Sequence, residues 1–131
     1  MDKTVLQSQK LAKPAGIFSP GVKVGAGNLI FVSGQVARNA AGEIVGEGDI
    51  RAQTRQAIEN VKAVLEAAGA TIDDIVKVTV FVTDVTQLAA IHEVRAEYFK
   101  RDYPASTLVE VKGLVSPELL IEIEAIAVTA P

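Results

Sequence analysis

Residues 75–83 read IVKVTVFVT, and this stretch decides the fold. Its side chains alternate: Lys77, Thr79 and Phe81 point one way and the intervening valines the other. A period of two with β-branched residues on one side predicts a strand with one face in the core. A segment with helical spacing stands on either side, so the centre of the chain is expected to fold as helix, strand, helix.

The segment before the strand predicts an amphipathic helix. Asp49 is expected to cap its start and Gly69 to end it. The apolar residues recur at helical spacing, at Ala57, Ile58, Val61, Val64, Leu65 and Ala68. The outer face is charged, and its two arginines are expected to form a solvated face with nearby acids: Arg51 and Arg55 with Glu59 and Glu47.

After the strand, Asp84 or Thr86 is expected to cap a second helix that runs to about Arg101. Its inner stripe comprises Leu88, Ile91, Val94 and Tyr98, and Pro104 follows its end. The remaining β-branched runs, separated by Gly and Asn turns, predict strands at 21–24, 29–35, 43–45, 107–111 and 119–128. Residues 25–28 are expected to form a tight turn between the first two.

This order predicts an α+β fold: one mixed six-stranded sheet with two helices on one face. Residues 1–131 are expected to form a single domain, with 1–13 as an N-terminal arm or short edge strand. The other sheet face is expected to be too apolar for water, on the basis of the valine row and of Ile121, Ile123 and Ala125. A homo-oligomer would cover such a face.

Composition excludes several classes of function. The chain has 131 residues, a net charge of −3, one His and no Cys, which rules out a disulfide framework, a thiolate nucleophile and a multi-histidine metal site within one chain. A carboxylate-only Mg²⁺ or Ca²⁺ site stays open. The acidic balance argues against nucleic-acid binding. No apolar run approaches the roughly 18–20 residues of a membrane span, so a soluble, cytoplasmic protein is expected.

Four segments, in this order and spacing, resemble the reactive intermediate deaminase (RidA/YjgF) family: Val32–Gln35, 51–69, Val78–Asp84 and Ile121–Ala127. The similarity runs from about residue 14 to residue 128. It implies a chorismate-mutase-like fold and a homotrimer with a central barrel and ligand clefts between neighbouring subunits. It also implies hydrolysis of enamine or imine intermediates to a keto acid and ammonia, with no metal or organic cofactor.

The resemblance supplies candidate site residues. Glu122 matches the carboxylate that holds and polarises the attacking water. Ser33 and Gly34 match the positions where a hydroxyl and a backbone N–H face the ligand. Phe18 stands where the family has a Tyr, and His92 stands where it has an Asn on the second helix.

One position departs from the family. Deaminating members carry a Pro-(Ala/Thr)-Arg-(Ser/Thr) run whose Arg binds the substrate carboxylate, whereas this chain reads Pro104-Ala105-Ser106-Thr107. A hydroxyl does not neutralise a carboxylate, and losing the charge-assisted pair costs about 1.5–3 kcal/mol. We therefore expect a substrate other than 2-iminobutanoate or 2-iminopropanoate. Ser106 and Thr107 are expected to contact it, with His92 as proton donor or partial replacement for the missing cation.

Each candidate also has an ordinary interpretation. Glu122 would share a polar strand face with Glu124, His92 would be a boundary residue, Phe18 a core or interface residue and Ser106 a loop residue. The favoured function is hydrolysis of an imine, enamine or related C–N bond in a small metabolite held in the intersubunit cleft. The alternative is a trimer that binds a small molecule without catalysis. An endoribonuclease or translation-inhibitor activity, after labels that some relatives carry, is disfavoured by the charge and the few aromatics.

Overall fold

In the computed structural model, which describes residues 2–131, the valine-rich stretch forms strand β4 (Ile75–Val82). Three further strands join it in a sheet of order β3-β6-β4-β5: β3 (Asn28–Val36), β5 (Ala105–Glu110) and β6 (Ile121–Thr129). Strands β4 and β5 are parallel, while β6 runs antiparallel to both of its neighbours. The predicted α+β class is confirmed.

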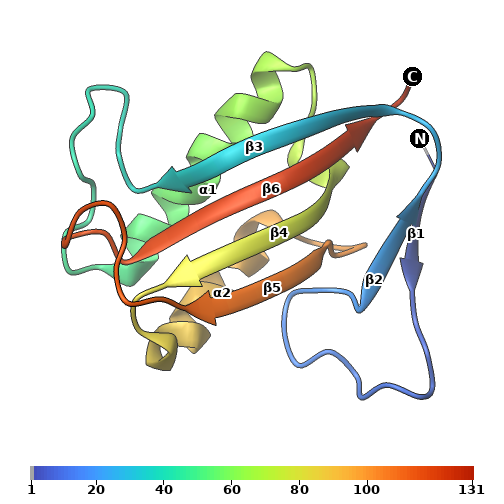
Figure 1. Cartoon of the computed structure of the whole chain (residues 1–131), viewed down its shortest axis with the longest axis horizontal. Helices are drawn as coiled ribbons and strands as arrows, with labels where there is room; N and C mark the ends of the chain where they lie inside the picture. The colour runs from blue at the N-terminus through green and yellow to red at the C-terminus, as the bar shows by residue number, and fades with distance from the viewer. Residues whose placement is uncertain (1) are drawn as a thin grey trace.

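Helices α1 (Ile50–Ala67) and α2 (Leu88–Tyr98) cover one face of this sheet and lie behind it in Figure 1. Two short 3-10 helices, η1 (Ile72–Asp74) and η2 (Val85–Gln87), precede β4 and α2. The core fills the space between the helices and the sheet. The valines of β4 at 78, 80 and 82 are buried in it, as their alternation predicted.

The predicted ends of the first helix are confirmed. The Asp49 carboxylate accepts a 3.1 Å hydrogen bond from the N–H of Ala52. Gly69 follows the helix with a φ of +72°, a conformation that glycine adopts without strain. Asp84 caps η2, and α2 ends at Tyr98, earlier than the expected end near residue 101. No helix within residues 2–131 is long and apolar enough to cross a membrane.

The six strands form two sheets, not the single six-stranded sheet that was predicted. Strand β1 (Lys3–Leu6), within the predicted arm, pairs antiparallel with β2 (Gly21–Val24) beside the larger sheet (Figure 1). The predicted strand at 43–45 makes only one isolated bridge, from Ile44 to Arg38. Gly42 and Gly46 flank it with φ of +81° and +76°, so the chain bends away at both ends of a segment only three residues long.

Residues 25–28 do not form the predicted hairpin turn; they carry the chain from one sheet into the other. Strand β3 pairs with β6, so β2 and β3 are not neighbours. A Cβ on Gly27 would overlap the carbonyl oxygen of Thr129, so a glycine is needed where the connection crosses the end of β6. A glycine-rich segment alone does not distinguish a hairpin from such a crossing.

The prediction that the valine row, Ile121, Ile123 and Ala125 lie on the open face of the sheet was wrong, and the open face is mixed. The valine row and Ile121, Ile123 and Ala125 of β6 face the helices, whereas Ile126 pairs with Phe31 and Lys77 on the open face. The open face carries Lys77, Thr79, Glu122 and Glu124, with Leu29, Phe31 and Val109 exposed among them. Alternation shows which residues share a face but not which face is covered. The more apolar face takes the helices because this buries more apolar surface.

The charged faces of the two helices pair with each other. Arg51 binds Glu93 and Arg55 binds Glu97, both at 2.8 Å. The predicted pairing with acids of α1 and the preceding loop was wrong. Because α1 and α2 lie side by side, acids on α2 come within reach of arginines spaced one helical turn apart on α1.

Candidate functional site

The Glu122 carboxylate lies against the backbone of Gly34 on the open face of the sheet. The pairing of β3 with β6 is interrupted between Val32 and Gln35, and Ser33 and Gly34 occupy this bulge. A Cβ built on Gly34 would overlap Oε2 of Glu122. A side chain at position 34 would therefore displace the carboxylate from this place. Residues in a bulge do not take part in the strand pairing, so Ser33 and Gly34 are available for contact with a ligand.

Ser33 and Thr107 lie on the same open face. Ser33 lines a groove of about 250 Å³ together with Lys77, Thr79 and Glu124. The Lys77 ammonium donates a 2.7 Å hydrogen bond to the hydroxyl of Thr107. The groove thus has a cation and a carboxylate among its walls. The sequence placed Lys77 opposite the valine row, as observed, but it was not singled out as a site residue.

His92 projects from α2 against the loop before β2. A Cβ on Gly16 would fall 2.6 Å from Cε1 of the imidazole, so the ring packs directly on the glycine backbone. Burial, and secondarily the positive charge of Arg95, lower the pKa of His92 below its ordinary value of 6.5. The imidazole is therefore mostly neutral at pH 7 and does not replace the missing cation.

The positive charge beside Ser106 comes from Arg95 on α2. Its side chain is 2% exposed, and Nη2 donates to the Ser106 hydroxyl at 3.2 Å and to the Ile17 carbonyl at 3.1 Å. The Phe99 ring lies 5.8 Å from the guanidinium carbon, within the range of a cation–π contact. Burial lowers the pKa of Arg95 to about 10, which leaves it charged at pH 7.

The helical spacing of the sequence indicates that Arg95 lies on the apolar face of its helix, although Arg95 was not predicted as a site residue. Arg95 lies four residues after Ile91 and four before Phe99, and both of these are buried. Helical spacing therefore places a guanidinium on the apolar stripe. Arginines at such positions usually reach solvent with their charged end, so spacing alone did not predict burial.

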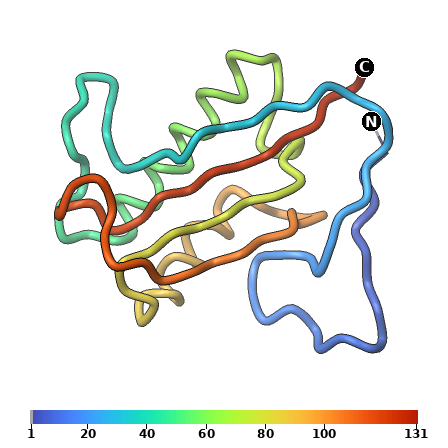
Figure 2. Tube along the Cα trace, in the orientation of Figure 1, coloured from blue at the N-terminus to red at the C-terminus, as the bar shows by residue number. Residues whose placement is uncertain are grey.

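Phe18 belongs to the loop that leaves β1 and returns to β2, which swings wide of the larger sheet (Figure 2). It lines a hollow of about 830 Å³ together with Asp102 and Tyr103. The loop is tied to the start of β5, because the N–H of Ser19 donates a 3.0 Å hydrogen bond to the Pro104 carbonyl. Phe18 therefore stands between Ile17, whose carbonyl binds Arg95 beside Ser106, and Ser19, which binds the chain just before β5.

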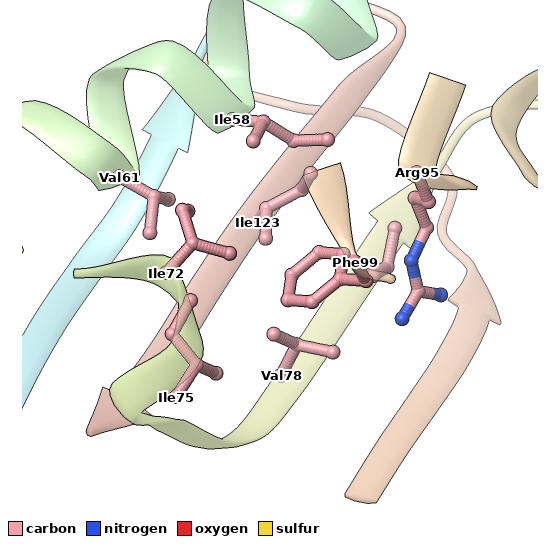
Figure 3. Close-up of a pocket in the computed structure, with 9 residues that line it drawn as sticks. Ile58, Val61, Ile72, Ile75, Val78, Arg95, Phe99 and Ile123 are labelled. Carbon is pink, nitrogen blue, oxygen red and sulfur yellow. The ribbon is translucent and has the colours of Figure 1, made fainter. Parts of the chain in front are cut away.

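A small cavity of about 10 Å³ lies between the helices and the sheet. Arg95 and Phe99 close one end of it, and aliphatic side chains form the rest of its wall (Figure 3). Its volume fits about one water molecule, so it is a packing defect of the core and not a ligand site. Within residues 2–131, no three His, Asp or Glu side chains gather where they could hold a metal ion.

The predicted site residues fall into two groups that a single chain does not bring together. The open-face group comprises Ser33, Gly34, Thr107 and Glu122. The edge group comprises Phe18, His92 and Ser106, to which the structure adds Arg95. It gathers where α2 and the loop before β2 meet the start of β5. Ser106 pairs across the sheet with buried Val78, whereas Glu122 pairs with Phe81, which points to the other face.

A family model described as Endoribonuclease L-PSP matches residues 8–129. The chain belongs to this family, the RidA/YjgF family. This RidA/YjgF-family protein is 48% identical to a RutC family protein of Pyrococcus abyssi, over 97% of this chain and 98% of the relative. The family resemblance read from the sequence is therefore confirmed.

Solved structures show the same fold. A Rid-family protein of unknown function from Yersinia pestis shares 40% identity and superposes with a TM-score of 0.90, covering 98% of this chain and 100% of its own. RidA from an Antarctic Psychrobacter shares 34% identity with a TM-score of 0.73, covering 96% of this RidA/YjgF-family chain and 99% of its own.

Proposed function

We propose that this protein hydrolyses an imine, an enamine or a related C–N bond in a small metabolite, without a metal or an organic cofactor. The observation that carries the proposal is the placement of Glu122 against Gly34. Glu122 is flanked on its strand by buried Ile121 and Ile123, and its carboxylate occupies the space that a Cβ at Gly34 would fill. Such an acid is placed to hold and deprotonate a water molecule.

In the proposed reaction, Glu122 takes a proton from water while the water oxygen attacks the sp² carbon of the imine. Backbone N–H groups near Gly34 and Thr107 stabilise the developing charge. His92 or a second water gives a proton to the nitrogen, which completes a carbinolamine. The carbinolamine hydroxyl then returns a proton to that group as the C–N bond breaks, and the leaving nitrogen takes the proton held by Glu122. One imine and one water thus yield one carbonyl compound and one ammonia, with no redox step.

Two copies of the chain are needed to combine the two groups of residues, and we place the ligand between neighbouring subunits of a homotrimer. Each copy contributes its open-face group to one cleft and its edge group to another. The open face also exposes Leu29 at 61% and Phe31 at 70%, apolar side chains that a neighbouring copy would cover. Closed symmetric assembly is the usual solution for such a face.

An imine-trapping assay tests the proposal. An amino-acid-derived imine is generated enzymatically in the presence of semicarbazide, and the protein competes with the trap. We expect the wild-type protein to lower the yield of semicarbazone, and Glu122→Gln to lose about 10²–10⁴-fold of this activity while keeping its fold. The series includes imines other than 2-iminobutanoate and 2-iminopropanoate, because Ser106 alters the site.

Equal, background-level trapping by the wild-type and Glu122→Gln proteins across the imine series would contradict the proposal and favour the non-catalytic binding protein. RNA is included as a second substrate because of the family description. RNA cleavage that survives purification and disappears in Glu122→Gln would instead favour the endoribonuclease.

A further inference from the structure

The end of β3, beyond the bulge, is held by a side chain of α1. Strand β3 lies at one edge of the sheet, with β6 on one side of it. Backbone groups on the outer side of an edge strand need partners from elsewhere. Asn60 supplies them at this end, because its Nδ2 donates 2.9 Å hydrogen bonds to the carbonyls of both Val36 and Arg38. One amide therefore holds two carbonyls of the segment that follows Gly34.

The amide of Asn60 has a single orientation. Nε2 of Gln56, one turn earlier on α1, donates a 2.8 Å hydrogen bond to Oδ1 of Asn60, so both ends of the amide are used. The backbone that it holds is a tight turn, since the N–H of Arg38 donates to the Val36 carbonyl at 2.8 Å. Ala37, between them, is fully buried. The end of β3 is thus anchored at one place on α1.

This anchored segment sets the register of β3 against β6. From Val32 to Val36, β3 advances four residues while β6 advances three, so the bulge adds one residue, and Val36 pairs with Glu122. Without the bulge, the ladder continued from Val32 would pair Gln35 with Glu122 instead. A shift of one residue also turns each side chain to the other face of the sheet. The backbone of Gly34 would then no longer lie against the carboxylate.

We infer that Asn60 is a positioning residue for Glu122: by holding Val36 it maintains the register that places Gly34 against the carboxylate. Asn60 acts through the backbone, because its donors bind carbonyls of β3. This inference rests on the proposed function and concerns how the acid is placed, not which substrate it attacks. It predicts that the loss of Asn60 lowers the rate of the chemical step and leaves ligand binding nearly intact.

The kinetics of Asn60→Leu test this role. The variant removes both donors, and we expect kcat for imine hydrolysis to fall about 30–100-fold with KM changed less than about twofold, because a small misplacement of a catalytic group is costly. Thr54→Val is the matched control. Thr54 is also a buried polar residue of α1, but its hydroxyl donates within the helix, to the Ile50 carbonyl at 2.7 Å. Thr54→Val should keep the wild-type kcat.

A double-variant cycle separates positioning from a general loss of stability. Gly34→Ala displaces the carboxylate directly. If Asn60 acts through the place of the carboxylate, Asn60→Leu should cost less than about threefold in the Gly34→Ala protein. A merely structural residue would give the same factor in both proteins. Asn60→Asp, which keeps the size of the side chain and loses the Nδ2 donors, enters the same cycle in case Asn60→Leu does not fold.

NMR contacts between the strands test the register without turnover. Residues 36 and 122 should be in cross-strand contact in the wild-type protein. In the Asn60 variants this contact should weaken, and a contact between residues 35 and 122 should appear. An unchanged 36–122 contact, a wild-type kcat, or equal factors in the two arms of the cycle, in an Asn60 variant that folds, would each overturn the inference.

The proposed function can fail separately. A register shift in the Asn60 variants, with no hydrolysis of any imine by the wild-type protein, would remove the hydrolase and leave Asn60 as the residue that places Glu122. Hydrolysis that depends on Glu122 but proceeds equally in Asn60→Leu and Asn60→Asp would keep the hydrolase and remove the positioning role.

Discussion

Gly34 leaves the space that the carboxylate of Glu122 occupies at the bulge of β3. Substituting alanine there forces a Cβ into Oε2 of Glu122 and displaces the carboxylate. Because a misplacement of about 1 Å can cost about 10²-fold in rate, we expect Gly34→Ala to lower kcat/KM for imine hydrolysis by about that factor. The thermal midpoint should change little, since the carboxylate lies at the surface and can rotate away.

Gly113→Ala is the matched control, because a Cβ at Gly113 meets no atom within 4 Å. It should retain wild-type activity and stability. Full activity in Gly34→Ala would mean that the position of Glu122 does not matter for the reaction.

His92 makes a second residue-scale prediction, on pH. The chain has a single His, so its Cε1 signal can be followed by NMR without ambiguity. Burial and the charge of Arg95 lower its pKa below 6.5, and we expect Arg95→Met to raise it. A titration midpoint at or above 6.5 in the wild-type protein, or one unmoved in Arg95→Met, would contradict this account of the cluster.

The same shift has a consequence for stability. The unfolded chain binds a proton at His92 near its ordinary pKa of 6.5, while the folded chain binds it only at lower pH. Between those two pKa values the unfolded state therefore holds more protons. Stability is complete above 6.5 and falls as the pH drops toward the folded pKa, and His92→Asn should remove this part of the pH dependence in urea unfolding.

The residues of the site differ in how far they could be predicted. Glu122 and Gly34 were named from the family resemblance, and their contact is what the structure adds. Arg95 was missed because a single sequence does not tell whether an arginine on an apolar stripe reaches water or is buried. That depends on what packs against α2, and the carbonyl of Ile17 comes from a distant part of the chain.

At the scale of elements, patterns that are local in sequence were predicted and patterns that depend on distant partners were not. The alternation of β4, the Asp49 cap and the Gly69 stop depend on neighbouring residues and are confirmed. The pairing of β1 with β2 and of β3 with β6 depends on contacts between segments that lie far apart in the sequence. Alternation and glycine content do not contain that information.

Gln53 joins α1 to the loop that leads into β6 and so helps to place Glu122. It is fully buried, donates to the carbonyls of Gly46 and Glu118, and accepts a 2.8 Å hydrogen bond from the N–H of Leu120. Gln53→Leu leaves these backbone groups unpaired, and we expect it to lower the free energy of unfolding by about 3 kcal/mol in urea.

Gln56→Leu is the control for this variant. Gln56 lies half-buried one turn away from the Gln53 contacts and makes one side-chain hydrogen bond, to Asn60. It should cost less than about 1 kcal/mol. A similar loss in both variants would mean that the Gln53 contacts do not hold the loop.

At the scale of the whole molecule, the sheet separates the two halves of the proposed site. Glu122 lies on the open face, while Arg95 and Ser106 lie on the helix side at the edge strand. In the proposed homotrimer, each chain gives its Glu122 to one cleft and its edge group to another. The central claim is that a working site takes its Glu122 from one subunit and its edge group from a neighbour.

Subunit mixing between Glu122→Gln and Arg95→Met tests this claim most directly, because Arg95→Met removes the hydrogen bonds to Ile17 and Ser106 that hold the edge group. Each variant alone should be nearly inactive in the imine-trapping assay. After subunit exchange at equal amounts, about a quarter of the clefts in a closed ring pair an intact Glu122 with an intact edge group. We predict recovery of about a quarter of wild-type activity. Successful exchange, verified by mass spectrometry of the mixed assemblies, with no recovery of activity would contradict the shared site.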